Sequence, residues 1–313
     1  MSAAMSAALA PELVAAQAAA DAANGALPDP TLLSPAEGRA QTERANAWWN
    51  RDLPEMAAAD EVTLTADPSL GTAPIRARRL VPPEVRGGLL LFVHGGGFAF
   101  CSPATHERCA RVLARETGLT VLVPDYRLAP EHPFPAGLTD TVAALRAAPD
   151  FAEVPGPFAI AGDSAGANLA LAALLHDIAA GRPVGVAAAM LFYGVFAADF
   201  ETASYRFFRD GPGLTRGKMQ RYWDWYLAPE GRSDPLAAPL LASDAALAAL
   251  PPTRLIAAGV DPLLSDSLAL GARLGTSVTI VPGVTHGFLQ MSRDLPQARS
   301  ALAEAAAFIR ANC

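Results

Sequence analysis

The sequence predicts an α/β fold in which a mostly parallel sheet is flanked by helices. From about residue 89 onward, short β-like runs alternate with helical segments, a pattern typical of parallel sheets. Runs such as 89–93 and 158–161 are continuously apolar, as in strands buried on both faces. The 313 residues are 51% hydrophobic and 18% charged, so the chain can bury a large core.

The individual elements follow from the local pattern. Residues 1–55 are rich in Ala and interrupted by Pro, which favours short helices. Residues 62–65 and 75–81 alternate like antiparallel edge strands. The strands expected next are 89–93, 120–123, 158–161, 187–193, 254–258 and 277–281, and the helices are 105–117, 138–147, the segment after 164, 263–274 and 297–309.

The alternation fails between about residues 197 and 244, where aromatic side chains are abundant. This interval predicts an insertion over the carboxyl edge of the sheet, because ligands of open α/β sheets bind there. Nothing in the rest of the chain resembles a linker between independent domains.

Charge and cysteine content exclude several classes of partner and location. A net charge of −7 argues against nucleic acid or an anionic membrane as the main partner. The N-terminus lacks a basic region, and Glu12 interrupts any signal-like apolar run. The sequence contains no uncharged apolar run of about 18 residues, so no membrane span is predicted. A cytoplasmic protein is expected, since the cysteines are too few for a disulfide framework: Cys101, Cys109 and Cys313.

Gly162-Asp163-Ser164-Ala165-Gly166 has the pattern of a nucleophile elbow at a strand-to-helix turn. Glycines flank Ser164 because side chains would clash in so tight a turn. The pattern is weak alone, so its meaning depends on residues elsewhere in the chain.

His94-Gly95-Gly96-Gly97 directly follows the apolar run 89–93. Three successive glycines let backbone N–H groups approach an oxygen that side chains would exclude, as in an oxyanion hole. A phosphate-binding loop is the alternative, but the Gly-Lys-Ser/Thr continuation and the G-x-G-x-x-G spacing are both missing.

A nucleophilic serine needs a base and an orienting carboxylate. His286 follows the last expected strand, and Asp261 follows the strand before it. Asp261 could instead cap the following helix, and Asp266, its nearest competitor, should lie within that helix. Other roles are favoured for the remaining four histidines. His94 belongs to the glycine loop, and His176 lies on the helix after Ser164. Surface or structural roles are expected for His106 and His132.

Taken together, these motifs resemble the hormone-sensitive-lipase-like family of bacterial esterases with the α/β-hydrolase fold. The resemblance covers about residue 89 to the C-terminus, and the order Ser164, Asp261, His286 matches that of α/β-hydrolases. The other matching segments are the glycine loop, the run Asp125–Ala136 and His286-Gly287-Phe288. Within Asp125–Ala136, Arg127 and Glu131 are interpreted as parts of a structural corner.

The resemblance implies a role for each motif. Ser164 would be the nucleophile, His286 the general base and acid, and Asp261 its orienting carboxylate. An oxyanion hole would be formed by the backbone N–H groups of Gly96, Gly97 and Ala165. Residues 1–55 would form an N-terminal cap segment on a catalytic domain of residues 56–313, joined by the insertion at about 197–244. The mechanism implies neither a metal nor an organic cofactor.

The expected substrate is a small, uncharged ester with a short or medium acyl chain. Its site would be lined by Trp48, Trp49, Phe98 and Tyr193, although packing on the body is the alternative for both tryptophans. Two positions depart from the family pattern: Ala167 stands in place of a further Gly, and Tyr193-Gly194 in place of Tyr-Pro.

Other functions of the same fold stay open. An amidase, a lactonase or an acyltransferase would use the same triad, and a non-catalytic small-molecule receptor is a further alternative. A homodimer, common in the family, is neither favoured nor excluded by the sequence.

Overall fold

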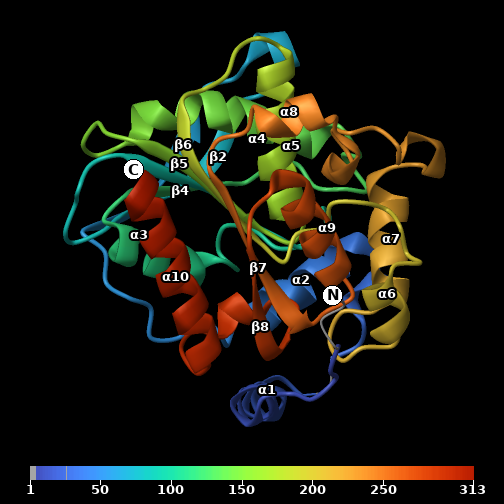
Figure 1. Cartoon of the computed structure of the whole chain (residues 1–313). Coiled ribbons are helices and arrows are strands. Elements are labelled where there is room, and N and C mark those ends of the chain that lie inside the picture. Colours follow the sequence, from blue (N-terminus) through green and yellow to red (C-terminus); the bar gives the residue numbers. More distant parts are fainter. Residues whose placement is uncertain (1–4, 26) are drawn as a thin grey trace.

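The computed structural model describes residues 5–25 and 27–313. Its centre is an eight-stranded sheet of order β1-β2-β4-β3-β5-β6-β7-β8 (Figure 1). The strands are β1 (Ala58–Leu64), β2 (Ile75–Val81), β3 (Leu89–Val93), β4 (Thr120–Pro124), β5 (Phe158–Asp163), β6 (Val186–Phe192), β7 (Thr253–Val260) and β8 (Val278–Thr285). The predicted α/β class is confirmed.

The strands from β4 and β3 through β8 pair in parallel, whereas β1 and β2 are antiparallel additions. The expectation that β2 forms an edge is wrong, because β2 lies between β1 and β4. β2 contains three arginines, which are unusual in an inner strand. Two of them, Arg78 and Arg79, form ion pairs and are half-buried, so β2 can lie between two other strands.

Helices cover both faces of the sheet (Figure 1). The strand β3 shows the reason, since Leu89, Leu91 and Val93 belong to one apolar cluster and Leu90 and Phe92 to the other. The helices α3 (Glu107–Thr117) and α10 (Pro296–Asn312) pack side by side on one face. The other face holds α4 (Ala136–Ala147), α5 (Ala165–Ala179), α8 (Asp244–Ala248) and α9 (Leu264–Leu274).

Two segments lie outside this alternation. The first contains α1 (Pro11–Asn24), the 3₁₀ turn η1 (Pro30–Leu32) and α2 (Pro35–Ala47); residues 1–4 and 26 of the predicted cap segment 1–55 lie outside the described residues. The second lies between β6 and β7 and contains α6 (Ala203–Phe207) and α7 (Arg216–Tyr226). Arg221 of α7 joins the two, donating to Thr31 Oγ1 at 2.6 Å and to Asp29 Oδ2 at 2.7 Å.

The predicted strands and helices match the structure closely, and the largest differences are at the start of β1, which begins at Ala58 and not at residue 62, and at the end of β8. β7 continues to Val260. β8 continues to Thr285, beyond the Pro282-Gly283 pair at which a strand would ordinarily stop. Both extensions bring the chain closer to Asp261 and His286. None of the helices formed by the described residues combines the length and apolarity needed to cross a membrane.

Candidate active site

Ser164 lies at the tight turn between β5 and α5. Its backbone has φ +54° and ψ −121°, a region that non-glycine residues rarely adopt. The turn is closed by Gly166, where an added Cβ would lie 2.0 Å from the Val93 carbonyl oxygen. A strained residue at this position is held by its surroundings, as in a nucleophile elbow.

His286 lies between Ser164 and Asp261, although the three residues come from distant parts of the chain. Its Nε2 is 2.8 Å from Ser164 Oγ, and its Nδ1 is 2.7 Å from Asp261 Oδ2. Asp261 is fully buried, and its Oδ1 accepts a hydrogen bond from the Leu263 N–H at 2.9 Å. This contact leaves Oδ2 free to face the imidazole, so the arrangement can relay a proton from a serine hydroxyl.

The competing carboxylate, Asp266, is hydrogen-bonded to the backbone and not to His286. It lies in α9, where its Oδ2 accepts hydrogen bonds from the backbone N–H groups of Phe196 and Ala197 at 2.9 and 3.1 Å. Burial raises the pKa of Asp266 to about 7 in spite of these bonds. Asp266 therefore fixes the chain that follows β6.

The glycine loop lies against the elbow. Gly96 and Gly97 line the same cavity as Ser164, and both have positive φ values, +122° and +60°. Ala165 is the first residue of α5, where backbone N–H groups have no partner within the helix. The structure thus brings together the three residues expected to form an oxyanion hole.

Asp163, inside the elbow motif, was not among the predicted site residues. It is almost fully buried, and its Oδ1 accepts a hydrogen bond from the Gly95 N–H at 2.8 Å. His106 Nε2 lies 3.2 Å from the same oxygen. Burial raises the pKa of Asp163, but His106 and the Gly95 N–H outweigh it and lower the pKa below its usual value. An ionised carboxylate therefore pins the glycine loop to the elbow.

The remaining histidines have structural or surface positions. His94 is fully buried and stacks on the Tyr126 ring at 4.4 Å; its Nδ1 lies 2.8 Å from the Gly95 carbonyl oxygen. Burial, together with nearby His106, lowers the pKa of His94 to about 3, so its imidazole is neutral. His176 pairs with Asp177, and His132 is exposed.

Arg127 and Glu131 of the Asp125–Ala136 run form ion pairs outside the triad. Arg127 pairs with the buried Asp140 at 2.7 Å. Glu131 pairs with Arg39 of α2, which also donates to the backbone carbonyl of Ala99 at 2.9 Å. The run therefore forms a structural corner that also attaches the N-terminal segment.

A cavity of about 210 Å³ opens at Ser164 and His286. Residues from both extra segments contribute to its wall, and none of the described residues that line it is Lys or Arg. Besides the residues already named, the wall includes Asn46, Trp49, Cys101, Leu214, Met219, Tyr222, Gln290 and Met291.

Of the four residues expected to line a substrate site, only Trp49 lies on this wall. Trp48 is turned away from it and stacks under the Arg51 guanidinium at 3.1 Å, because adjacent residues of a helical turn point about 100° apart. Phe98 is buried and stacks on the Tyr226 ring at 3.8 Å. The prediction that Trp48 and Phe98 line the cavity is corrected accordingly.

Tyr193 lies behind the cavity wall instead of on it. Its ring packs edge-on against His286 with centroids 4.9 Å apart, and its hydroxyl lies 3.4 Å from Asp163 Oδ2. The side chain is buried, and Tyr193 directly follows the end of β6. Tyr193 can support His286 without contacting a bound molecule.

Comparison with known proteins agrees with this geometry. Residues 90–290 match a family model described as an α/β-hydrolase fold. The chain is 32% identical to an acetyl esterase of Salmonella typhi over 88% of each chain. It is 34% identical to carboxylesterase NlhH of Mycobacterium tuberculosis, covering 80% of this chain and 81% of that protein.

Comparison with solved structures also identifies esterases as similar proteins. A thermostable esterase from Pseudomonas putida superposes with a TM-score of 0.86 at 29% identity, over 99% of both chains. The family match, the relatives and the arrangement of the elbow and glycine loop lead to one assignment. The chain belongs to the hormone-sensitive-lipase-like family of α/β-hydrolases.

Proposed function

We propose that this protein hydrolyses small, uncharged carboxylic esters through a covalent acyl-enzyme formed on Ser164. The observation that carries the proposal is the continuous contact from Ser164 Oγ to His286 Nε2 and from His286 Nδ1 to Asp261, at 2.8 and 2.7 Å. The relatives named as esterases support ester hydrolysis as the reaction.

In the first step, Ser164 Oγ attacks the ester carbonyl while His286 Nε2 takes the hydroxyl proton. The carbonyl oxygen becomes an oxyanion that accepts hydrogen bonds from the N–H groups of Gly96, Gly97 and Ala165. Collapse of the tetrahedral intermediate expels the alcohol, which receives the proton from His286. Water then attacks the acyl group by the same sequence and releases the acid, and Asp261 stabilises the imidazolium in both steps.

The cavity supports short acyl chains. Its volume of about 210 Å³ is below the range of roughly 300–1,000 Å³ usual for sites of drug-sized ligands. We assign residues 1–55 and about 197–244 as the cap, because Trp49 and Tyr222 from these segments form part of the wall. The three free cysteines support a reducing compartment.

The proposal is tested with p-nitrophenyl acetate and butyrate. Ser164→Ala should lower kcat/KM by roughly 10⁴-fold or more. Ser233→Ala, a substitution of an exposed serine, should leave it unchanged. Near-normal turnover by Ser164→Ala would refute the assignment. Matched ester, amide and lactone substrates separate an esterase from the related enzymes, and covalent labelling by a fluorophosphonate separates an enzyme from a receptor.

A further inference from the structure

Arg108 is a buried arginine whose donors serve a segment outside its own helix. It is 5% exposed, at the second position of α3. A cation is unfavourable in the first turn of a helix, where acidic residues are preferred. The position of Arg108 is therefore explained by its contacts and not by α3 itself.

Those contacts all go to the turn that follows α2. Arg108 Nε donates to the Trp49 carbonyl at 2.6 Å, and Nη2 donates to the carbonyls of Arg51 and Asp52, the latter at 2.7 Å. Burial and the neighbouring Arg293 lower the pKa of Arg108. These backbone carbonyls lie at the C-terminal end of α2, where a positive charge is stabilised.

Asn50, a residue of the turn, also joins the turn to the start of α3 through its side chain. Its Oδ1 accepts the Arg108 backbone N–H at 3.1 Å, and its Nδ2 donates to the Ala104 carbonyl at 2.8 Å. The N-cap residue of α3, His106, makes no side-chain cap of its own, so Asn50 supplies that cap from another segment.

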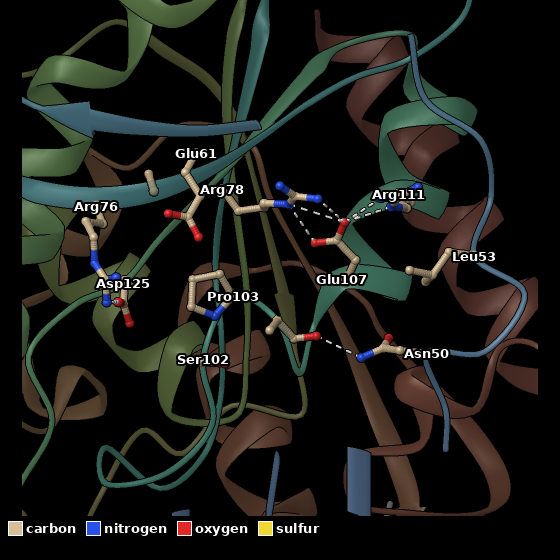
Figure 2. Close-up of a pocket in the computed structure, with 12 residues that line it drawn as sticks. Asn50, Leu53, Glu61, Arg76, Arg78, Ser102, Pro103, Glu107, Arg111 and Asp125 are labelled. Atoms are coloured by element: carbon tan, nitrogen blue, oxygen red, sulfur yellow. Dashed lines mark hydrogen bonds and ion pairs between the residues drawn. The ribbon is translucent and has the colours of Figure 1, made fainter. Parts of the chain in front are cut away.

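The turn holds a conformation that needs such support. Asp52 has φ +51°, a value costly for a residue with a Cβ, and persists because its surroundings fix it. A second cavity of about 510 Å³ lies against the turn, lined by Asn50, Leu53 and Ala104 among others. Figure 2 shows residues that line this cavity, with Asn50 hydrogen-bonded to the backbone carbonyl of Ala104 and Glu107 between Arg78 and Arg111. The turn has open space beside it, so packing alone does not hold it.

Trp49 is the residue whose place depends on this arrangement. Its carbonyl is bound by Arg108, and its side chain lines the catalytic cavity. We propose that Arg108 is a positioning residue that fixes Trp49 as a wall of the catalytic cavity and thereby limits the size of the ester that binds. The inference rests on the proposed ester hydrolysis, for which it names a determinant of size selectivity.

The test compares kcat/KM for p-nitrophenyl acetate and p-nitrophenyl octanoate. Arg108→Met keeps the aliphatic stem and removes the donors, so the acetate-to-octanoate ratio should fall roughly tenfold, with kcat on acetate within about threefold of wild type. Arg108→Lys, which retains a charge and one set of donors, should restore part of the ratio. Arg115→Met, which changes an exposed arginine of the same helix, is the matched control and should leave the ratio unchanged.

A double-mutant cycle shows whether Arg108 acts through Trp49. Trp49→Ala should lower the ratio as Arg108→Met does, and adding Arg108→Met should change it no further. An unchanged ratio in a cooperatively melting Arg108→Met protein, or equal effects of Arg108→Met with and without Trp49, would overturn the proposal. If Arg108→Met does not fold, Asn50→Ala is judged by the same ratio and cycle. Failure of the wild type to hydrolyse either ester would refute the proposed function instead.

Discussion

Replacing Asp163 should damage catalysis although this residue is not a member of the Ser164–His286–Asp261 triad. Asp163→Ala leaves the Gly95 N–H buried without its partner at 2.8 Å and removes the buried pairing with His106. Breaking a buried pair costs about 3–5 kcal/mol, which corresponds to a loss in Tm of roughly 5–8 °C for a chain of this length. Because Gly95 precedes Gly96 and Gly97, to which we assign the oxyanion hole, we expect kcat to fall roughly 10–100-fold, with KM changed less than about threefold.

Steady-state kinetics on p-nitrophenyl butyrate and thermal melts of the same preparations check this expectation. Asp140→Ala is the matched control, since Asp140 is likewise a buried carboxylate, here paired with Arg127, but does not line the cavity. It should lower Tm and leave kcat within about twofold. Equal losses of kcat in the two variants, or an unchanged kcat in Asp163→Ala, would refute the role given to Asp163.

The pH dependence of the same residue has a definite sign. The folded-state pKa of Asp163 is lowered, so its stabilisation is present above its ordinary value of 3.8 and is lost as the pH falls through the folded value. Asp163→Asn should therefore be less stable than wild type at pH 7, and the difference should shrink below about pH 4. A difference in Tm that stays constant from pH 7 to pH 3 would contradict the ionised state.

Three further predictions concern Gly97, Asp266 and Cys101. Gly97→Ala should reduce activity more than tenfold, because an added Cβ would lie 2.5 Å from the Tyr222 ring; Gly181→Ala, with a similar φ and no atom within 4 Å of its added Cβ, should leave activity unchanged. Burial raises the pKa of Asp266 to about 7, so the wild type loses stability relative to Asp266→Asn as the pH rises from about 4 to 7. Melts at pH 5 and 8 test this, and a pH-independent difference would contradict it. Burial also raises the pKa of Cys101 to about 12, so its alkylation at pH 8 should be at least about 100-fold slower than that of free cysteine. Mass spectrometry measures the rate, and a rate similar to that of free cysteine would contradict the prediction.

The parallel sheet and the position of Ser164, Asp261 and His286 at its edge could be predicted because strand ends are visible in the sequence. Parallel strands present their carboxyl ends at one edge, so residues that follow β5, β7 and β8 must lie near each other. That rule needs only the order of the elements, and each was apparent from its apolar run.

Contacts made by side chains from other elements could not be predicted in this way. His106 precedes a helix instead of ending a strand, so no rule places it beside Asp163, 57 residues further along the chain. Trp48 and Trp49 have the same chemistry, and only the turn after α2 decides which one reaches the cavity. Phe98 is apolar next to the glycine loop, but α7 supplies the Tyr226 ring that covers it.

The clasp made by Arg221 with Asp29 and Thr31 has a consequence for how a substrate enters. Arg221 couples α7 to η1. If one of these two segments moves, the other must move with it, or both hydrogen bonds must break first. The pair is partly exposed, so salt weakens it. We therefore expect a substrate that displaces either segment to displace both, more easily at high ionic strength.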